Sequence, residues 1–144
     1  MTIEQSALSK KLKLKAGANG AVVNAPKGYL DELKPLPPEA KVASSLKGTH
    51  DWIQVFCSTK AELDALAPVA AAALPPASML WLCFPKGSSK IQTDLTRDIG
   101  WEVLESIDLK WVTLVSVNDT WSAFAMRPYK PKEERQQSAW TSRA

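Results

Sequence analysis

Short apolar runs, separated by polar and proline-containing segments, recur along most of the chain and predict its β-strands. The runs at 51–57 and 79–84 are almost continuously apolar, as strands covered on both faces of a sheet are. The runs at 110–117 and 121–126 are separated by Asn118-Asp119-Thr120, which suits a hairpin turn. Strands are therefore expected at 21–24, 51–57, 79–84, 110–117 and 121–126, with a short edge strand at 41–43.

Helical patterns lie between these runs. Thr59 and Glu62 have the spacing of a capping box, which predicts a helix that starts at 60 and ends before the prolines at 75–76. Thr93 is placed as the N-cap of a further helix, because apolar residues follow it at helical spacing as far as 103. A shorter helix is expected at 28–33, where prolines follow closely.

The alternation of strands and helices predicts the fold class. It is typical of an α/β, Rossmann-like domain with three layers, in which a mostly parallel sheet has helices on both faces and ends in an antiparallel hairpin. We expect a single α/β domain at 16–128, preceded by a flexible basic arm at 1–15 and followed by a disordered polar tail at 129–144.

The net charge of +3 is unevenly distributed. Residues 1–15 and 127–144 each carry +3, so the segment between them carries −3. A folded body without a clustered basic face is not expected to bind nucleic acid. The two basic tails are instead candidate contacts for a protein partner.

Cysteine and histidine content argues against a metal or redox site. Cys57 and Cys83 lie in apolar runs, as buried reduced thiols do, and His50 is the only histidine and is expected in a surface loop. No metal site is expected. The first residues lack the apolar core of a signal peptide, and no apolar run is long enough to span a membrane, so a cytoplasmic location is expected.

The predicted order of elements resembles the class I methyltransferase fold, shortened by a strand and a helix. Three segments (Pro85-Lys86 and its small-residue loop, 93–96 and 119–122) are similar to an uncharacterised bacterial domain-of-unknown-function family. The resemblance covers 14–129 and supports the fold; the family implies no activity.

One loop departs from the methyltransferase pattern. Methyltransferases of this class have a glycine-rich loop after the first strand, where the backbone approaches the cofactor. Here the loop at 24–29 contains Pro26, which lacks an amide donor, and only one glycine, Gly28. Ser44 and Ser45 stand where an acidic residue would hold ribose hydroxyls. S-adenosylmethionine is therefore not expected to bind, and no cofactor is predicted.

Candidate ligand-binding residues lie in the loops that follow the strands. A candidate anion site combines cations and hydroxyls beside the predicted helix at 93: Lys86, Ser88, Ser89, Lys90 and Arg97. Residues expected to line the crevice between the first and third strands are Asn24, Lys27, Tyr29 and Ser58. The alternative for both sets is an ordinary solvated loop. No nucleophile, base or carboxylate pair forms a catalytic motif.

Three functions remain open. The first is a non-catalytic domain that binds a small anionic or nucleotide-like molecule on a methyltransferase-like scaffold. The second is a protein-interaction module with a vestigial crevice. The third is an S-adenosylmethionine-dependent methyltransferase.

Overall fold

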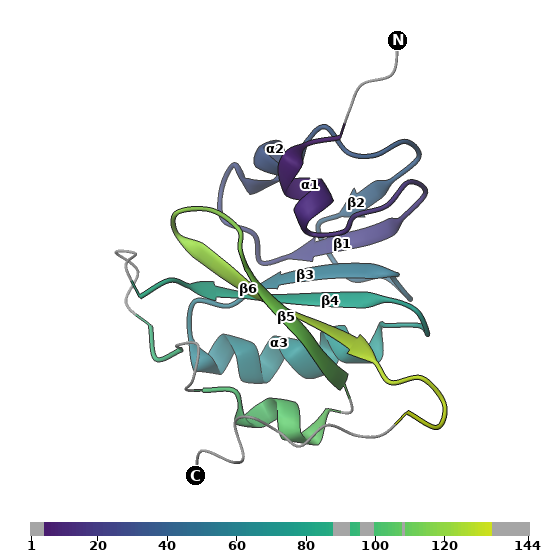
Figure 1. Cartoon of the computed structure of the whole chain (residues 1–144). Coiled ribbons are helices and arrows are strands. Elements are labelled where there is room, and N and C mark those ends of the chain that lie inside the picture. The colour runs from purple at the N-terminus through teal and green to yellow at the C-terminus, as the bar shows by residue number, and fades with distance from the viewer. Residues whose placement is uncertain (1–4, 88–92, 96–99, 108, 134–144) are drawn as a thin grey trace.

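The computed structural model describes residues 5–87, 93–95, 100–107 and 109–133 of the 144-residue chain. In these residues six strands form one sheet in the order β2-β1-β3-β4-β6-β5 (Figure 1). The strands are β1 (Asn19–Val23), β2 (Lys41–Ala43), β3 (Trp52–Phe56), β4 (Met79–Pro85), β5 (Leu109–Ser116) and β6 (Trp121–Pro128). The first four run parallel, and β6 is antiparallel to both β4 and β5. The predicted mostly parallel α/β sheet with a closing hairpin is confirmed.

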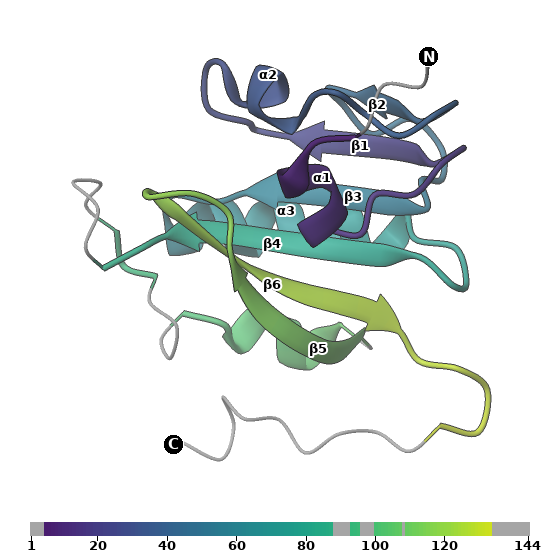
Figure 2. The same ribbon diagram turned by 45° about the horizontal axis from the view of Figure 1, so that its top comes forward.

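Helices cover both faces of the sheet (Figures 1 and 2). One face packs against α3 (Lys60–Ala72) and the 3-10 helix η1 (Glu102–Ser106), and the other against α1 (Ala7–Lys11) and α2 (Tyr29–Leu33). Side chains alternate along β4, so Leu82 faces α3 while Trp81 and Cys83 face α1. Because both faces are covered, β3 is wholly buried, which explains its continuous apolar run.

The N-terminal segment differs from the flexible arm that the sequence predicts. From Gln5 onward it packs on the sheet, and the side chains of Leu12 and Leu14 are almost completely buried. The indole nitrogen of Trp52 donates a 2.8 Å hydrogen bond to the carbonyl of Leu12. The lysines around these leucines masked their role, because Leu12 and Leu14, with Lys13 between them, follow no regular helical period where they lie on the sheet.

The segment after β4 also differs from its prediction. The hydroxyl of Thr93 accepts from the amide of Leu95, but neither residue is helical. The next described element is the short η1, so the part of the expected helix at 96–99 lies outside the described residues. The Asp94 carboxylate accepts a 2.6 Å hydrogen bond from the amide of Lys60, which attaches this segment to the start of α3.

Two further expectations need correction. His50 is buried rather than on a surface loop, and its Nε2 accepts from the amide of Lys47 at 3.0 Å. The part of the expected tail that is described, residues 129–133, contacts the body, because the Glu133 carboxylate pairs with both Arg127 and Lys110. Residues 134–144 of the expected tail lie outside the described part. No described helix is both long and apolar enough to cross a membrane.

Candidate functional site

The topological switch point of the sheet lies between β1 and β3. From β1 the chain moves outward to β2, and β3 then pairs on the other side of β1. In open α/β sheets, ligands bind beyond the carboxyl ends of the strands at this point. Two of the predicted crevice residues, Asn24 and Ser58, do follow β1 and β3 there.

Asn24 closes the switch point with its own hydrogen bonds. Its backbone has a φ of 59°, a left-handed conformation that asparagine tolerates better than most residues. The side-chain amide donates to the carbonyl of Phe56 at 2.8 Å and to the carboxylate of Glu62 at 2.7 Å. Asn24 therefore ties the end of β1 to the end of β3 and to α3.

Glu62 is the centre of this network, and sequence reasoning had assigned it only a capping role. Its carboxylate accepts from the amide of Ser58 at 2.8 Å and from the Ser58 hydroxyl. The hydrogen bond from that hydroxyl, followed by those from the Ser58 amide and Asn24, holds the pKa of Glu62 below its ordinary value. Thr59 caps α3 as predicted, and the Glu62 carboxylate interacts with the backbone of Thr59, as in a capping box, and also with Ser58, one residue further back.

This network makes stability depend on pH. A carboxyl group whose pKa is lowered on folding stabilises the protein above its ordinary pKa of 4.5, and this contribution is lost as pH falls through the lowered value. We expect Glu62→Gln to reduce the free energy of unfolding by about 1 kcal/mol at pH 7. The difference from the parent should shrink below about pH 4.5, as measured by urea denaturation across pH.

Glu39→Gln is the matched control, since Glu39 is exposed and makes no ion pair or side-chain hydrogen bond with the described residues. Its unfolding free energy should follow the parent at every pH. A Glu62→Gln difference that stays constant down to pH 3 would show that the carboxylate charge is not what holds the network together.

Tyr29 holds its aromatic ring in the core, and the residue also lines the pocket at the ends of β1 and β2 that is described below. The ring is fully buried on the α1 face, packs edge-on against Phe56 and donates a 2.8 Å hydrogen bond from its hydroxyl to Gln54 Oε1. Gln54 Nε2 in turn donates to the sulfur of Cys83 at 3.3 Å. Burial is the main cause that raises the pKa of both Tyr29 and Cys83, so these groups remain neutral and form a structural network.

Cys57, at the end of β3, has the same inert character. It is buried, and its burial raises its pKa to about 12, so the thiolate that would act as nucleophile or metal ligand is not formed at neutral pH. Among the described residues, no group of three or more histidine, cysteine and acidic side chains could hold a metal ion.

Only Lys86 of the candidate anion site can be placed. Its amide donates to the carbonyl of Thr120 at 2.8 Å, and its Nζ donates to the hydroxyl of Ser116 at 2.6 Å, so it joins the end of β4 to the β5–β6 hairpin. Ser88, Ser89, Lys90 and Arg97 lie outside the described residues. The convergence of these cations therefore stays a prediction.

A pocket of about 410 Å³ lies at the carboxyl ends of β1 and β2, beside α2. Its volume is within the range of roughly 300–1,000 Å³ typical of small-molecule sites. The exposed polar side chains in its walls are the Asp31 carboxylate and the Ser44 hydroxyl, with no lysine or arginine; the lining residues are Val22, Ala25, Pro26, Gly28, Tyr29, Leu30, Asp31 and Ser44. The fourth predicted crevice residue, Lys27, is exposed and does not line it.

No family model and no curated protein sequence matches this chain. Solved structures do share its architecture. A SAM-dependent methyltransferase from Aquifex aeolicus is 15% identical, with a TM-score of 0.53 over 81% of this chain and 85% of its own. The chain has a methyltransferase-like fold. The DhpI–SAH complex gives a TM-score of 0.57 at 9% identity, covering 85% of this chain and 82% of its own.

Magnesium protoporphyrin IX methyltransferase from Synechocystis PCC 6803, with bound SAH, gives a TM-score of 0.54 at 7% identity over 85% of this chain and 78% of its own. At these identities the likeness establishes the fold alone. It confirms the methyltransferase-like, Rossmann-like architecture expected from the order of elements. The finer resemblance to a bacterial family of unknown function stays a prediction.

Proposed function

We propose that this chain is a non-catalytic binding domain that takes a nucleoside-like molecule in the pocket at the carboxyl ends of β1 and β2. The observation that carries the proposal is the position of that pocket, at the sheet edge where α/β folds bind ligands. The Ser44 hydroxyl and the Asp31 carboxylate can accept hydrogen bonds from ligand hydroxyls, and Val22 and Leu30 supply apolar contact. Because the described lining has no cation, it favours a nucleoside over a nucleotide.

The neighbouring switch point supports binding without catalysis. A ligand longer than a nucleoside would extend from the pocket toward the ends of β1 and β3, where Asn24, Ser58 and Glu62 are bonded to one another. Displacing them would leave the Glu62 carboxylate without its donors. Pro26 also removes an amide from the loop that would approach such a ligand. S-adenosylmethionine-dependent methyl transfer is the competing proposal, and it is supported by the fold of the structural neighbours.

Titration calorimetry with adenosine, adenosine monophosphate and S-adenosylmethionine tests the proposal. Adenosine should bind, and neither the phosphate nor the methionyl group should tighten binding, because the pocket lining offers no cation to the first and the bonded Asn24, Ser58 and Glu62 stand in the path of the second. The bound ligand should also raise the thermal midpoint, since a ligand at about 100 times its Kd adds about 2.7 kcal/mol of stability.

Two neighbouring serines provide matched variants. Ser44 lines the pocket and Ser45 does not, although both are exposed. Ser44→Phe should fill the entrance and weaken adenosine binding by at least about 10-fold, a loss of about 1.4 kcal/mol, while Ser45→Phe should bind like the parent.

A low-micromolar constant for S-adenosylmethionine with much weaker adenosine binding would instead support the methyltransferase. If no nucleoside raises the thermal unfolding midpoint, the result would support the alternative that the protein is a protein-interaction module. The observation in its favour is Trp111 on the edge strand β5, which is 37% exposed.

A further inference from the structure

Two basic segments from opposite ends of the chain lie together on the folded body. Lys13 and Lys15 come from the segment after α1, and Arg127 comes from the end of β6, yet all three line one pocket of about 370 Å³. This pocket lies at the amino end of the parallel strands, opposite the switch point, and its floor includes Trp52 and Met79. More than a hundred residues of sequence therefore separate charges that the fold places side by side.

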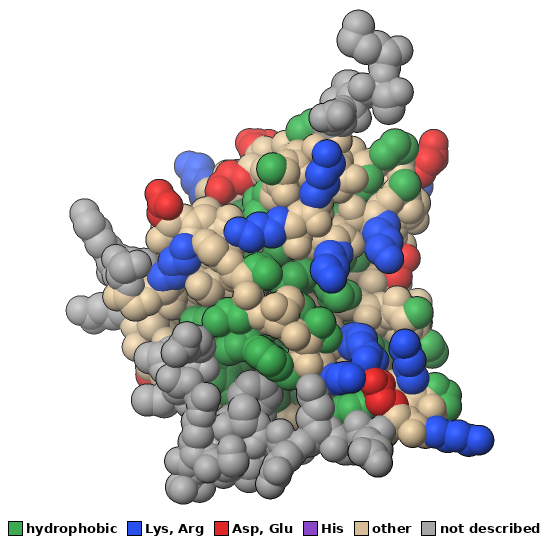
Figure 3. Space-filling model, in the orientation of Figure 1, with side chains coloured by type: hydrophobic (Ala, Val, Ile, Leu, Met, Phe, Trp, Pro, Cys, Tyr) green, Lys and Arg blue, Asp and Glu red, His purple; other side chains and the backbone are tan. Residues whose placement is uncertain are grey.

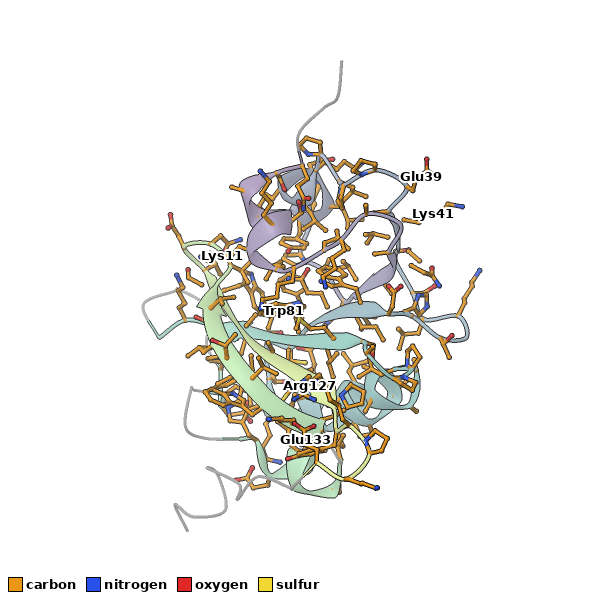
Figure 4. The ribbon with its side chains drawn as sticks, turned by 45° about the vertical axis from the view of Figure 1, so that its right-hand side comes forward. Lys11, Glu39, Lys41, Trp81, Arg127 and Glu133 are labelled. Carbon is orange, nitrogen blue, oxygen red and sulfur yellow. The ribbon has the colours of Figure 1, made fainter. Side chains whose placement is uncertain are left out.

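The body holds both segments in position. Leu12 and Leu14 are buried on either side of Lys13, so the lysine backbone is fixed to the sheet. At the other segment, the Glu133 carboxylate bonds to Arg127 and Lys110 and accepts from the amide of Lys130. Arg127 and Glu133 lie beside each other at the end of β6, and Lys11 projects from α1 (Figure 4).

Most of the cations here are uncompensated. Six lysines of the two segments form no ion pair or side-chain hydrogen bond with any described residue: Lys10, Lys11, Lys13, Lys15, Lys130 and Lys132. Among the residues that the structure describes, the nearby carboxylates of Glu133 and Asp51 are both engaged, Glu133 by Arg127 and Lys110, and Asp51 by the amide of Asn19. We call the six lysines together with Arg127 the basic surface.

The distribution of charge favours an extended partner. Figure 3 shows lysine and arginine side chains spread across the face that carries α1 and the β5–β6 hairpin, with acidic side chains mainly at its rim. A small anion would engage a few of these cations, whereas a chain of phosphates can neutralise many at once and release its counterions. We propose that the basic surface binds nucleic acid through its phosphate backbone.

The sequence predicts no nucleic-acid binding, because it shows no clustered basic face on the folded body; the structure does bring basic residues together there. The two basic segments were expected to be tails beside a body of charge −3, which leaves no clustered basic face. The burial of Leu12 and Leu14 and the ion pairs of Glu133 attach both segments to that body. The surface is also separate from the pocket beside α2, so this inference does not depend on the proposed nucleoside site.

Fluorescence anisotropy with labelled single-stranded and duplex oligonucleotides of mixed sequence provides the test. Binding by the full-length protein should weaken steeply between about 50 and 200 mM salt and show little dependence on sequence. Lys13→Gln with Lys15→Gln should weaken binding by at least about 10-fold at the lower salt concentration. The slope of log affinity against log salt should become shallower by about 0.9 for each lysine that contacts a duplex phosphate.

Lys41→Gln with Lys47→Gln is the matched control, because both lysines are exposed and lie outside the basic surface. Figure 4 shows Lys41 on the edge strand β2, away from Arg127 on β6 near the other edge of the sheet. The control should bind like the parent, and circular dichroism should show that both variants are folded. The Lys13 and Lys15 variant should bind adenosine like the parent. The two tests can therefore fail independently of each other.

Three results would overturn the proposal. The first is no binding of either oligonucleotide at 50 mM salt. The second is equal loss in the control and the Lys13 and Lys15 variant. The third is binding to phosphatidylcholine vesicles that contain phosphatidylglycerol, with no binding to oligonucleotides, which would assign the surface to a membrane.

Discussion

Replacing Leu12 with alanine should lower the free energy of unfolding by about 2–5 kcal/mol, the cost of removing a fully buried leucine side chain. Leu12 is enclosed between α1 and the sheet, and its carbonyl accepts the hydrogen bond of the buried Trp52 indole. The cavity left by the substitution would loosen the packing of α1 and its following segment on the sheet. Urea denaturation measures the change.

Lys11→Ala is the control one residue away. Lys11 is exposed and has no partner among the described residues, so its replacement should change the unfolding free energy by less than about 0.5 kcal/mol. If Leu12→Ala is as mild as Lys11→Ala, the first fifteen residues are a dispensable arm after all. That outcome would also weaken the basic surface, which depends on this segment being held in place.

Tyr29→Phe should cost about 1–3 kcal/mol, because it leaves the buried Oε1 of Gln54 without its donor. The ring of Tyr29 and its contact with Phe56 are retained in this variant, so the loss reports the hydrogen bond rather than packing. Since the phenol is buried and its pKa is raised, the effect should be constant from pH 6 to pH 9.

A double-mutant cycle with Gln54→Leu checks this account. In the Gln54→Leu background the Oε1 acceptor is already absent, so removing the Tyr29 hydroxyl leaves no buried acceptor without a donor. Tyr29→Phe should therefore reduce the free energy of unfolding clearly less in this background than in the parent. Strictly additive effects would mean that the two groups do not depend on each other, and that Tyr29 stabilises the fold by its ring alone.

Much of the fold follows from local chemistry. The continuous apolar runs of β3 and β4, the Asn118 turn and the Thr59 cap are each confirmed close to their predicted positions. These features depend on neighbours in the sequence, either through alternation along a strand or through a side chain that bonds to an amide two or three residues away.

The candidate site was only partly predictable. Asn24 and Ser58 could be found because they follow strands that a parallel sheet must bring together. An aromatic residue at a helix start fits a crevice and a core equally well, and local sequence does not show that the Tyr29 hydroxyl would bond to Gln54 on β3. Glu62 carried a signal, its capping spacing, but that signal does not show that Asn24 would reach the same carboxylate.

The α/β class and the positions of most strands and of α3 could be predicted from local patterns, because apolar runs buried on both faces and hairpin turns each involve only a few neighbouring residues. Tertiary structure alone decided where the charges lie. Lys13 and Arg127 meet at one pocket only because Leu12 and Leu14 bury themselves on the sheet and Glu133 binds the end of β6. The energy of interaction between charges depends on their separation in space, and here contacts between residues more than a hundred positions apart in the sequence set that separation.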